Sequence, residues 1–284
     1  MTMGARNSLD TSSQFGSRNA SFFERLVWKA SNWKAIPQEW RRRLRKRFAR
    51  KVIGPFDVVN DGMKFRLYPA ENYCDRVLFG RGELPERAEH EALLPLIRPG
   101  MVFVDIGANV GTYSIFVGKQ LGGDLALISF EPHPRTFEKL LFNLTVNDLP
   151  TDHIINAGVG PESTTMTLWS DGGSNIGHTS LLRQGTANAK IGIEVPIAPL
   201  LETLHERSID HVDILKVDVE GFEDQALVPF LKSADEKLLP NHILIEVTHK
   251  NLWESDLGSL LSELRYKQQF ATEENWLLSR EIRT

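Results

Sequence analysis

From residue 101 onward, short apolar runs alternate with longer segments in which apolar positions recur at helical spacing. The apolar runs cover residues 102–106, 126–130, 212–217 and 243–247, and the helical segments cover 112–121, 134–147, 221–231 and 252–266. Apolar runs without polar interruption are typical of strands that are buried on both faces. The pattern therefore predicts an α/β domain with a mostly parallel sheet and helices on both faces.

Weaker patterns fill the remainder of this domain. We expect strands at 153–159 and 165–169, a short helix at 199–206, and a C-terminal β-hairpin that turns near residues 272–275. Ahead of the sheet, residues 63–68 alternate like a strand, and residues 86–97 have helical spacing that stops at a Pro-Gly pair. We interpret residues 61–284 as one domain, with 61–100 as a small lead-in.

The first 60 residues have a different character. Residues 1–20 are polar, with few apolar side chains to bury, and are predicted to be a disordered tail. Residues 21–51 show helical spacing, and Pro37 divides them into two helices, of which the second is densely basic. We therefore expect residues 21–60 to form a basic, amphipathic helical extension.

This extension allows three interpretations. Its tryptophans, Trp28, Trp33 and Trp40, can pack on the body, or they can lie with the arginines of residues 21–51 in the headgroup layer of an anionic membrane. A nucleic-acid footprint is the third. Residues 1–60 hold 13 Lys or Arg against 4 Asp or Glu, whereas the rest holds 20 against 33. The body is thus acidic, which argues against an extended RNA track.

Cysteine content and hydropathy bear on the compartment. Cys74 is the single cysteine, which excludes an intrachain disulfide and a four-cysteine zinc site. No stretch approaches the ~20 apolar residues that cross a bilayer, and the polar N-terminus lacks the order of a secretory signal. We expect a cytoplasmic protein, placed at the inner face of the membrane if the extension contacts lipid.

A glycine turn follows the first buried strand of the sheet. Asp105, Gly107, Asn109 and Gly111 fall in the segment VDIGANVG, which opens a helix, and open α/β sheets bind ligands at such turns. The dinucleotide fingerprint places a glycine where this chain has Asn109, because a pyrophosphate needs that room. The turn therefore favours a ligand without phosphates, such as S-adenosylmethionine, over a nicotinamide dinucleotide.

The next strand ends at Glu131, where a carboxylate can accept hydrogen bonds from both ribose hydroxyls of a nucleoside. The strand that follows carries Asn156 and Ala157 at its end, and we expect these residues beside the adenine. Glu131 alone does not discriminate, because dinucleotide oxidoreductases also bind ribose with an acid. A nucleotide-dependent oxidoreductase therefore stays the alternative on the same type of sheet.

Three segments together resemble the FkbM-type methyltransferases: VDIGANVG at 104–111, FEPHP at 130–134 and ILKVDVEGFE at 214–223. The resemblance spans residues 89–247, and the third segment is the most specific. It implies a Rossmann-like class I methyltransferase fold, S-adenosylmethionine as cofactor, and O-methylation, often of sugar hydroxyls in glycans, glycolipids or natural products. It implies nothing about residues 21–51.

The third segment carries the candidate catalytic residues. Lys216, Asp218 and Glu220 alternate at the end of a buried strand, so they share one side if the strand geometry persists. We take Asp218 as the first candidate for general base, with Lys216 holding it ionised and Glu220 binding acceptor or cofactor. A network that only shapes the turn is the alternative.

His249 follows the next strand and is a further candidate base, since its ordinary pKa is near neutral. Asp218, Glu246 and His249 could share a divalent metal, but their spacing is not diagnostic, so we assign no metal ligand. Residues 171–180 form a Gly- and Ser-rich loop that we interpret as a lid over the acceptor. Besides the oxidoreductase, the alternative function is an RNA- or membrane-docking protein.

Overall fold

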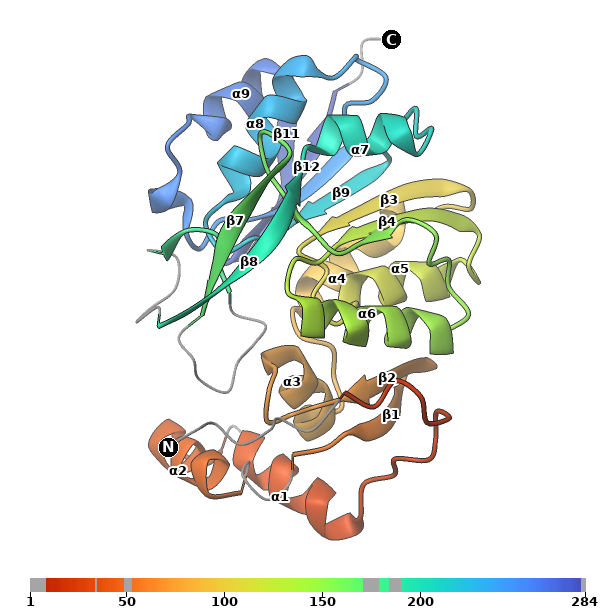
Figure 1. Ribbon diagram of the computed structural model, residues 1–284, viewed down its shortest axis with the longest axis vertical. Helices are drawn as coiled ribbons and strands as arrows, with labels where there is room; N and C mark the ends of the chain where they lie inside the picture. Colours follow the sequence, from red (N-terminus) through yellow and green to blue (C-terminus); the bar gives the residue numbers. More distant parts are fainter. Residues whose placement is uncertain (1–8, 34, 49–52, 171–178, 184–189, 282–284) are drawn as a thin grey trace.

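The computed structural model describes residues 9–33, 35–48, 53–170, 179–183 and 190–281. Within them, the largest sheet has the strand order β11-β12-β10-β9-β3-β4-β5 (Figure 1). Its strands are β3 (Met101–Ile106), β4 (Leu125–Phe130), β5 (Ile154–Ile155), β9 (Ile214–Val217), β10 (His242–Glu246), β11 (Tyr266–Ala271) and β12 (Asn275–Arg280). Pairing is parallel from β5 to β10, and the β11–β12 hairpin joins β10 antiparallel. This confirms the mostly parallel sheet and the C-terminal hairpin.

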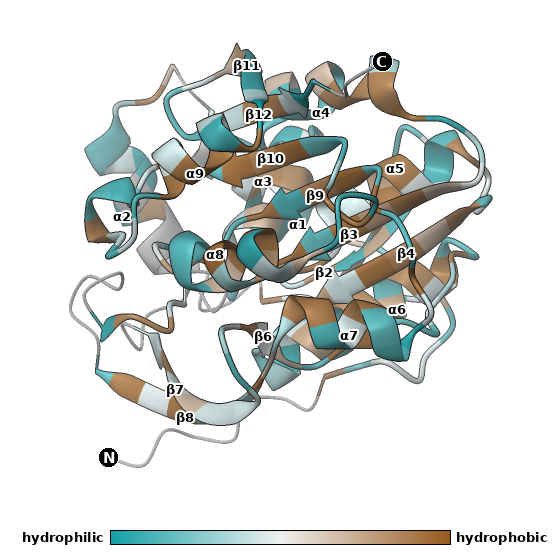
Figure 2. Ribbon diagram, turned by 90° about the horizontal axis from the view of Figure 1, so that it is seen from above, coloured by the Kyte–Doolittle hydropathy of each residue, from teal (hydrophilic) through white to brown (hydrophobic). Residues whose placement is uncertain are grey.

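Helices cover both faces of this sheet (Figure 2). On one face lie α7 (Leu200–Glu206), α8 (Glu223–Ser233) and α9 (Leu257–Glu263); on the other lie α4 (Arg87–Leu93), α5 (Thr112–Gln120) and α6 (Pro134–Val146). Strand β3 shows why its sequence is continuously apolar. Val104 and Ile106 pack toward α7–α9, whereas Phe103 packs toward α4–α6, and all three side chains are buried. Both faces of the strand therefore need apolar side chains.

Some element boundaries differ from the sequence prediction. The strand expected at 153–159 is divided between β5 and β6 (Gly158–Val159), which pairs in a second sheet with β8 (Ile191–Ala198) and β7 (Thr164–Ser170). Strand β8 was not predicted from the sequence. Of the helix expected at 252–266 only α9 is present, because Asp256 caps α9 and Tyr266 already belongs to β11; a separate short helix, Lys250–Leu252, precedes it.

The N-terminal part lies beside α6, away from the hairpin of β11 and β12 (Figure 1). It contains α1 (Phe22–Asn32), α2 (Gln38–Phe48), β1 (Phe56–Asn60), β2 (Met63–Leu67) and α3 (Tyr73–Arg81). The expected pair of helices, divided at Pro37, is therefore confirmed, whereas β1 and α3 were not predicted. A short helix, Leu94–Leu96, extends α4. No helix among the described residues is long and apolar enough to span a membrane.

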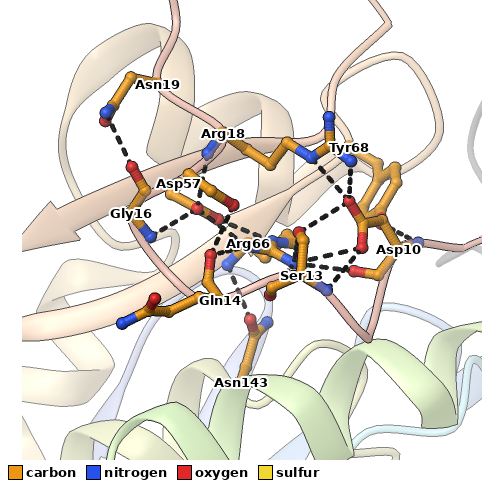
Figure 3. Close-up of polar contacts among 11 residues, drawn as sticks. Asp10, Ser13, Gln14, Gly16, Arg18, Asn19, Asp57, Arg66, Tyr68 and Asn143 are labelled. Atoms are coloured by element: carbon orange, nitrogen blue, oxygen red, sulfur yellow. Dashed lines mark hydrogen bonds and ion pairs between the residues drawn. The ribbon is translucent and has the colours of Figure 1, made fainter.

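Residues 9–20 differ from the predicted disorder. The guanidinium of Arg66, only 1 % exposed, forms two hydrogen bonds with the carboxylate of Asp57 (2.7 and 2.9 Å) and others with the backbone oxygens of Asp10, Ser13 and Gln14 (2.9–3.0 Å; Figure 3). This part of the chain is thus ordered by polar contacts with a buried charge rather than by apolar burial. Residues 1–8 of the predicted tail lie outside the described residues.

Residues 10–18, which we call the strap, also bind Asp57 directly. The backbone N–H groups of Gly16 and Arg18 donate to its Oδ2 at 2.7 and 3.0 Å. The backbone N–H of Asp10 donates to the hydroxyl of Tyr68. Strap, β1 and β2 therefore form one hydrogen-bonded unit, and α1 begins only a few residues after the strap ends.

Candidate active site

A cavity of about 290 Å³ opens at the carboxyl ends of β3, β4, β9 and β10. The chain order of the strands reverses between β3 and β9, which is where open α/β sheets bind their ligands. Among the residues that the structure describes, six acidic side chains and no Lys or Arg line the cavity. The acidic residues are Glu86, Glu131, Asp218, Glu220, Glu246 and Glu274. This chemistry suits a ligand that carries positive charge.

The glycine turn forms the floor of the cavity. Gly107 has a φ of +75°, and a Cβ atom on it would overlap the carbonyl oxygen of Asp218. Its N–H donates to the carbonyl of Phe130 at 3.0 Å, so the turn joins the ends of three neighbouring strands. Gly111, with a φ of +91°, begins α5 but does not line the cavity.

Asp105 lies behind this floor rather than on the cavity. Its side chain is fully buried, and one oxygen accepts a hydrogen bond from the hydroxyl of Ser114 at 2.6 Å. The other oxygen lies 3.5 Å from Nζ of Lys216. Asp105 is therefore placed to hold Lys216 and the turn. Of the two acidic residues that the sequence predicted to bind the cofactor, Glu131 faces the cavity and Asp105 does not.

Lys216 connects β9 to the turn. Its ammonium donates to the carbonyl oxygen of Gly107 at 2.9 Å and lies 3.5 Å from Oδ2 of Asp218. Burial lowers the pKa of Lys216, but the charges of Asp218, Asp105 and Glu86 outweigh burial, so the pKa is raised overall. The expected ion pair between Lys216 and Asp218 is present.

Glu131 presents a carboxylate whose orientation the backbone fixes. Its oxygens accept from the N–H groups of Asn109 and His133, both at 2.9 Å. Burial raises the pKa of Glu131 to about 7 in spite of these bonds. Asn156 does not line the cavity; its amide donates to the backbone oxygens of Glu131 and Pro132, whereas Ala157 does line it.

One wall of the cavity comes from α3, which was not predicted. Tyr73 and Cys74 begin this helix and face the cavity, where burial raises the pKa of the Cys74 thiol. The side chain of Asn72 caps the helix and also donates to the side chain of Asn109 at 2.7 Å. An Asn followed three residues later by Asp is a helix-start signal that could have revealed α3.

Glu86 is a second residue that the sequence did not suggest. It precedes α4 with a φ of +54°, and its carboxylate accepts from the hydroxyl of Tyr113 at 2.7 Å. Burial and the nearby charge of Asp218 raise the pKa of Glu86 to about 7. Glu274 and Asn275, at the turn of the C-terminal hairpin, also line the cavity. Their positions depend on tertiary packing, which leaves no local signal.

The remaining predicted residues lie on the opposite side. Strand β9 ends at Val217, and Glu220 has a φ of +56°, so it departs from the expected alternation and lies 3.4 Å from Nε2 of His249. Burial, followed by repulsion from Asp218 and Glu220, raises the pKa of Glu246 to about 10. Glu220, Glu246 and His249 have side-chain atoms within 4.8 Å of one another. The sequence suggested Asp218, Glu246 and His249 as residues that could share a divalent metal; in the structure Glu220, and not Asp218, completes this group.

Of the predicted lid, residues 171–178 lie outside the described residues. Thr179 and Leu181 line the cavity, and the hydroxyl of Ser180 donates to the carbonyl of Glu220 at 2.8 Å. The end of this loop is therefore joined to the turn that follows β9. Its role as a lid stays a prediction.

Comparison with known proteins gives the class of this site. The model of the methyltransferase FkbM domain matches residues 105–273, more than half of the chain. The methyltransferase sdnD of Sordaria araneosa is 27 % identical over 161 residues, and the 31-O-demethyl-FK506 methyltransferase FkbM of Streptomyces tacrolimicus is 26 % identical over 156. These regions span 47 % and 46 % of this chain and 60 % of each relative.

Among solved structures, an FkbM methyltransferase from Methylobacillus flagellatus KT is 16 % identical, with a TM-score of 0.43, over 74 % of this chain and 55 % of the other. The family model includes Asp105, Glu131 and the whole segment from Lys216 to His249. The chain therefore belongs to the FkbM family of S-adenosylmethionine-dependent methyltransferases.

Proposed function

We propose that this protein transfers a methyl group from S-adenosylmethionine to a hydroxyl, in a sugar of a glycan, glycolipid or natural product. The observation that carries the proposal is the acid-rich cavity at the switch between β3 and β9, with Glu131 held by two backbone N–H groups. The relative from Streptomyces supports an oxygen acceptor, because its name describes an O-demethyl compound. Family membership favours this function over an oxidoreductase.

The cofactor half of the cavity comprises Gly107, Asn109, Glu131 and Ala157. S-adenosylmethionine, when bound, supplies an electrophilic methyl group on a sulfonium. Glu131 accepts hydrogen bonds from the ribose hydroxyls, and Gly107 lets the turn after β3 lie directly against the backbone of Asp218, which closes the floor. The surplus of carboxylates favours the cationic sulfonium and amino groups. Asp105, Gly111 and Asn156 act as positioning residues behind this surface.

The acceptor half comprises Asp218, Glu220, Glu246 and His249. Asp218 accepts the proton of the attacking hydroxyl, and its Oδ2 forms an ion pair with the Lys216 ammonium, 3.5 Å away, which orients the carboxylate. With a pKa of about 10, Glu246 is protonated at neutral pH and can donate a hydrogen bond to a second acceptor oxygen. Glu220 and His249 orient one another and bind the acceptor, and His249 is the alternative base.

Glu131→Gln is expected to weaken binding of S-adenosylhomocysteine, the methyl-transfer product, by about 1–3 kcal/mol, because two ribose hydroxyls lose a charged acceptor. Because the pKa of Glu131 is about 7, its ionised fraction rises with pH in that range. Binding to the unaltered protein should therefore strengthen from about pH 6 to pH 8. The variant should lose the part of that slope that Glu131 contributes, while Glu86, whose pKa is also about 7, keeps its smaller part. Calorimetric titration at several pH values measures both.

The matched control is Glu274→Gln, which removes one negative charge at the exposed hairpin turn of the same cavity. It should leave most of the affinity and the pH slope unchanged. Equal losses in both variants would mean that net charge, and not a ribose contact, sets the affinity. Unaltered binding by Glu131→Gln would show that the ribose lies elsewhere.

Asp218→Asn is expected to retain S-adenosylhomocysteine binding and to lose turnover by about 10²–10⁴-fold, the usual contribution of a positioned base. The assay supplies methyl-labelled S-adenosylmethionine with saccharide and lipid-linked saccharide acceptors, and turnover is compared on each acceptor that takes label. Full activity here, with loss in His249→Gln, would transfer the base role to His249. Label incorporated only into RNA would contradict a sugar acceptor.

A further inference from the structure

Large hydrophobic side chains are exposed on the first two helices. The exposed fractions are 82 % for Phe22, 63 % for Phe23, 51 % for Leu26, 63 % for Trp33 and 59 % for Trp40, and we call these five residues the arm surface. Of the other large hydrophobic residues that the structure describes, only Val59 is more than half exposed. Such a concentration of apolar side chains on one segment marks a binding surface.

Helix α1 has two apolar sides, of which the fold uses one. Trp28 is 2 % exposed and packs edge-on against Phe79 of α3, with ring centroids 6.4 Å apart. Phe22 and Leu26, four residues apart, lie on a different side of the helix. The exposed side is therefore additional to the packing that holds α1 on the body, and the expectation that the tryptophans pack on the body holds for Trp28 but not for Trp33 or Trp40.

The segment that carries the arm surface is rich in positive charge. Residues 21–48 contain nine Lys or Arg and two Glu. Arg25 and Lys29 are exposed on α1, and the guanidinium of Arg43 lies 5.4 Å from the centre of the Trp40 ring. Glu24 forms a capping box with Ser21 at the helix start, so its carboxylate already has hydrogen-bond partners. Apolar side chains bordered by cations characterise helices that bind the interface of anionic bilayers.

The body holds α1, and with it Phe22, Phe23 and Leu26 of the arm surface, in a fixed position. The strap binds the buried pair of Arg66 and Asp57, and α1 follows it directly. Contacts between α1 and α3, among them that of Trp28 with Phe79, hold the middle of the helix, and α3 supplies Tyr73 and Cys74 to the cavity. A surface presented in this way needs no ordering on binding, which lowers the entropy cost of docking.

We propose that the arm surface docks this protein on an anionic lipid bilayer. The aromatic and aliphatic side chains enter the headgroup region, and the arginines and lysines contact lipid phosphates. A second copy of the chain is disfavoured, because a symmetric contact would bring two basic arms together. A nucleic-acid duplex is disfavoured because its phosphates bind cations and leave Phe22, Phe23 and Leu26 without a partner.

Co-sedimentation of the full chain with vesicles tests this proposal. Binding is expected to vesicles of phosphatidylglycerol and phosphatidylcholine, and to be at least about tenfold weaker with phosphatidylcholine alone or at ~0.5 M NaCl. Phe22→Ser combined with Phe23→Ser should lower the partition coefficient about tenfold or more, as should Arg25→Gln combined with Lys29→Gln. All four side chains are exposed, so the fold should tolerate these changes.

The matched control is Ile191→Ser, which removes an exposed apolar side chain from β8, outside the basic arm. It should bind vesicles as the unaltered chain does. Binding that ignores lipid charge, equal binding by the Phe22/Phe23 variant, or a preference for RNA over vesicles would overturn the proposal. Because the arm variants leave the cavity intact, they should bind S-adenosylhomocysteine normally. A lack of lipid binding and a lack of cofactor binding are thus separate failures.

Discussion

Gly107→Ala is expected to lower the free energy of unfolding by about 2–5 kcal/mol and to abolish binding of S-adenosylhomocysteine. Two effects add at this position. An alanine at a φ of +75° costs about 1–2 kcal/mol, and overpacking adds about 1–3 kcal/mol or more. The new methyl group would overlap the backbone oxygen of Asp218, which cannot change rotamer, so β3 and β9 would have to separate at the floor of the cavity.

Gly100→Ala is the matched control for this substitution. Gly100 has a nearly identical φ of +72°, but nothing lies within 4 Å of the Cβ position, so the variant isolates the backbone cost of about 1–2 kcal/mol. Urea unfolding measures both variants, and calorimetry measures ligand binding. Similar losses of stability in the two variants would show that the strand ends move apart easily, and the close contact would then not define the site.

Arg66→Met is expected to destabilise the protein by about 3–5 kcal/mol, the usual cost of removing one partner of a buried ion pair. Methionine keeps much of the apolar volume, but the carboxylate of Asp57, on a residue only 5 % exposed, loses its two hydrogen bonds from the guanidinium. The backbone oxygens of Asp10, Ser13 and Gln14 lose their donor at the same time. The strap should therefore become sensitive to limited proteolysis.

Two variants make this expectation specific. Arg87→Met removes an arginine that pairs with Glu91 on the surface of α4, with side-chain exposures of 71 % and 58 %, and should not change the unfolding midpoint measurably. Adding Asp57→Asn to Arg66→Met should recover part of the lost stability, because the uncompensated charge is removed. A strap that stays protected from protease in Arg66→Met would contradict the role given to this network.

The sheet was predictable because its strands are buried on both faces, so that β3, β4, β9 and β10 each leave an apolar run in the sequence. The strap was not predictable in the same way. Low apolar content predicts disorder when burial of apolar surface is the source of order. Here the partner of the strap is the charge of Arg66, some 50 residues away, and the same polar residues that suggested disorder supply the hydrogen bonds.

The site residues that lie at strand ends and glycine turns were predictable from the local sequence. Those that reach the cavity through tertiary packing were not. Glu131 and Asn109 belong to strand ends and glycine turns, which the topology brings together. Asp105 lies in β3, just before the same turn, but its side chain points to the buried side, and the sequence alone does not distinguish the two directions. Glu86 and Tyr73 reach the cavity from elements outside the sheet, so no strand register predicts them.

The strap has a mechanical consequence for the protein. It holds the start of α1 against the hairpin of β1 and β2, while Trp28 clamps the middle of α1 on α3. Helix α3 in turn joins the glycine turn through the hydrogen bond between Asn72 and Asn109. Packing and hydrogen bonds therefore connect α1 to the wall of the cavity without a break, so a displacement of this helix is expected to reach Asn109.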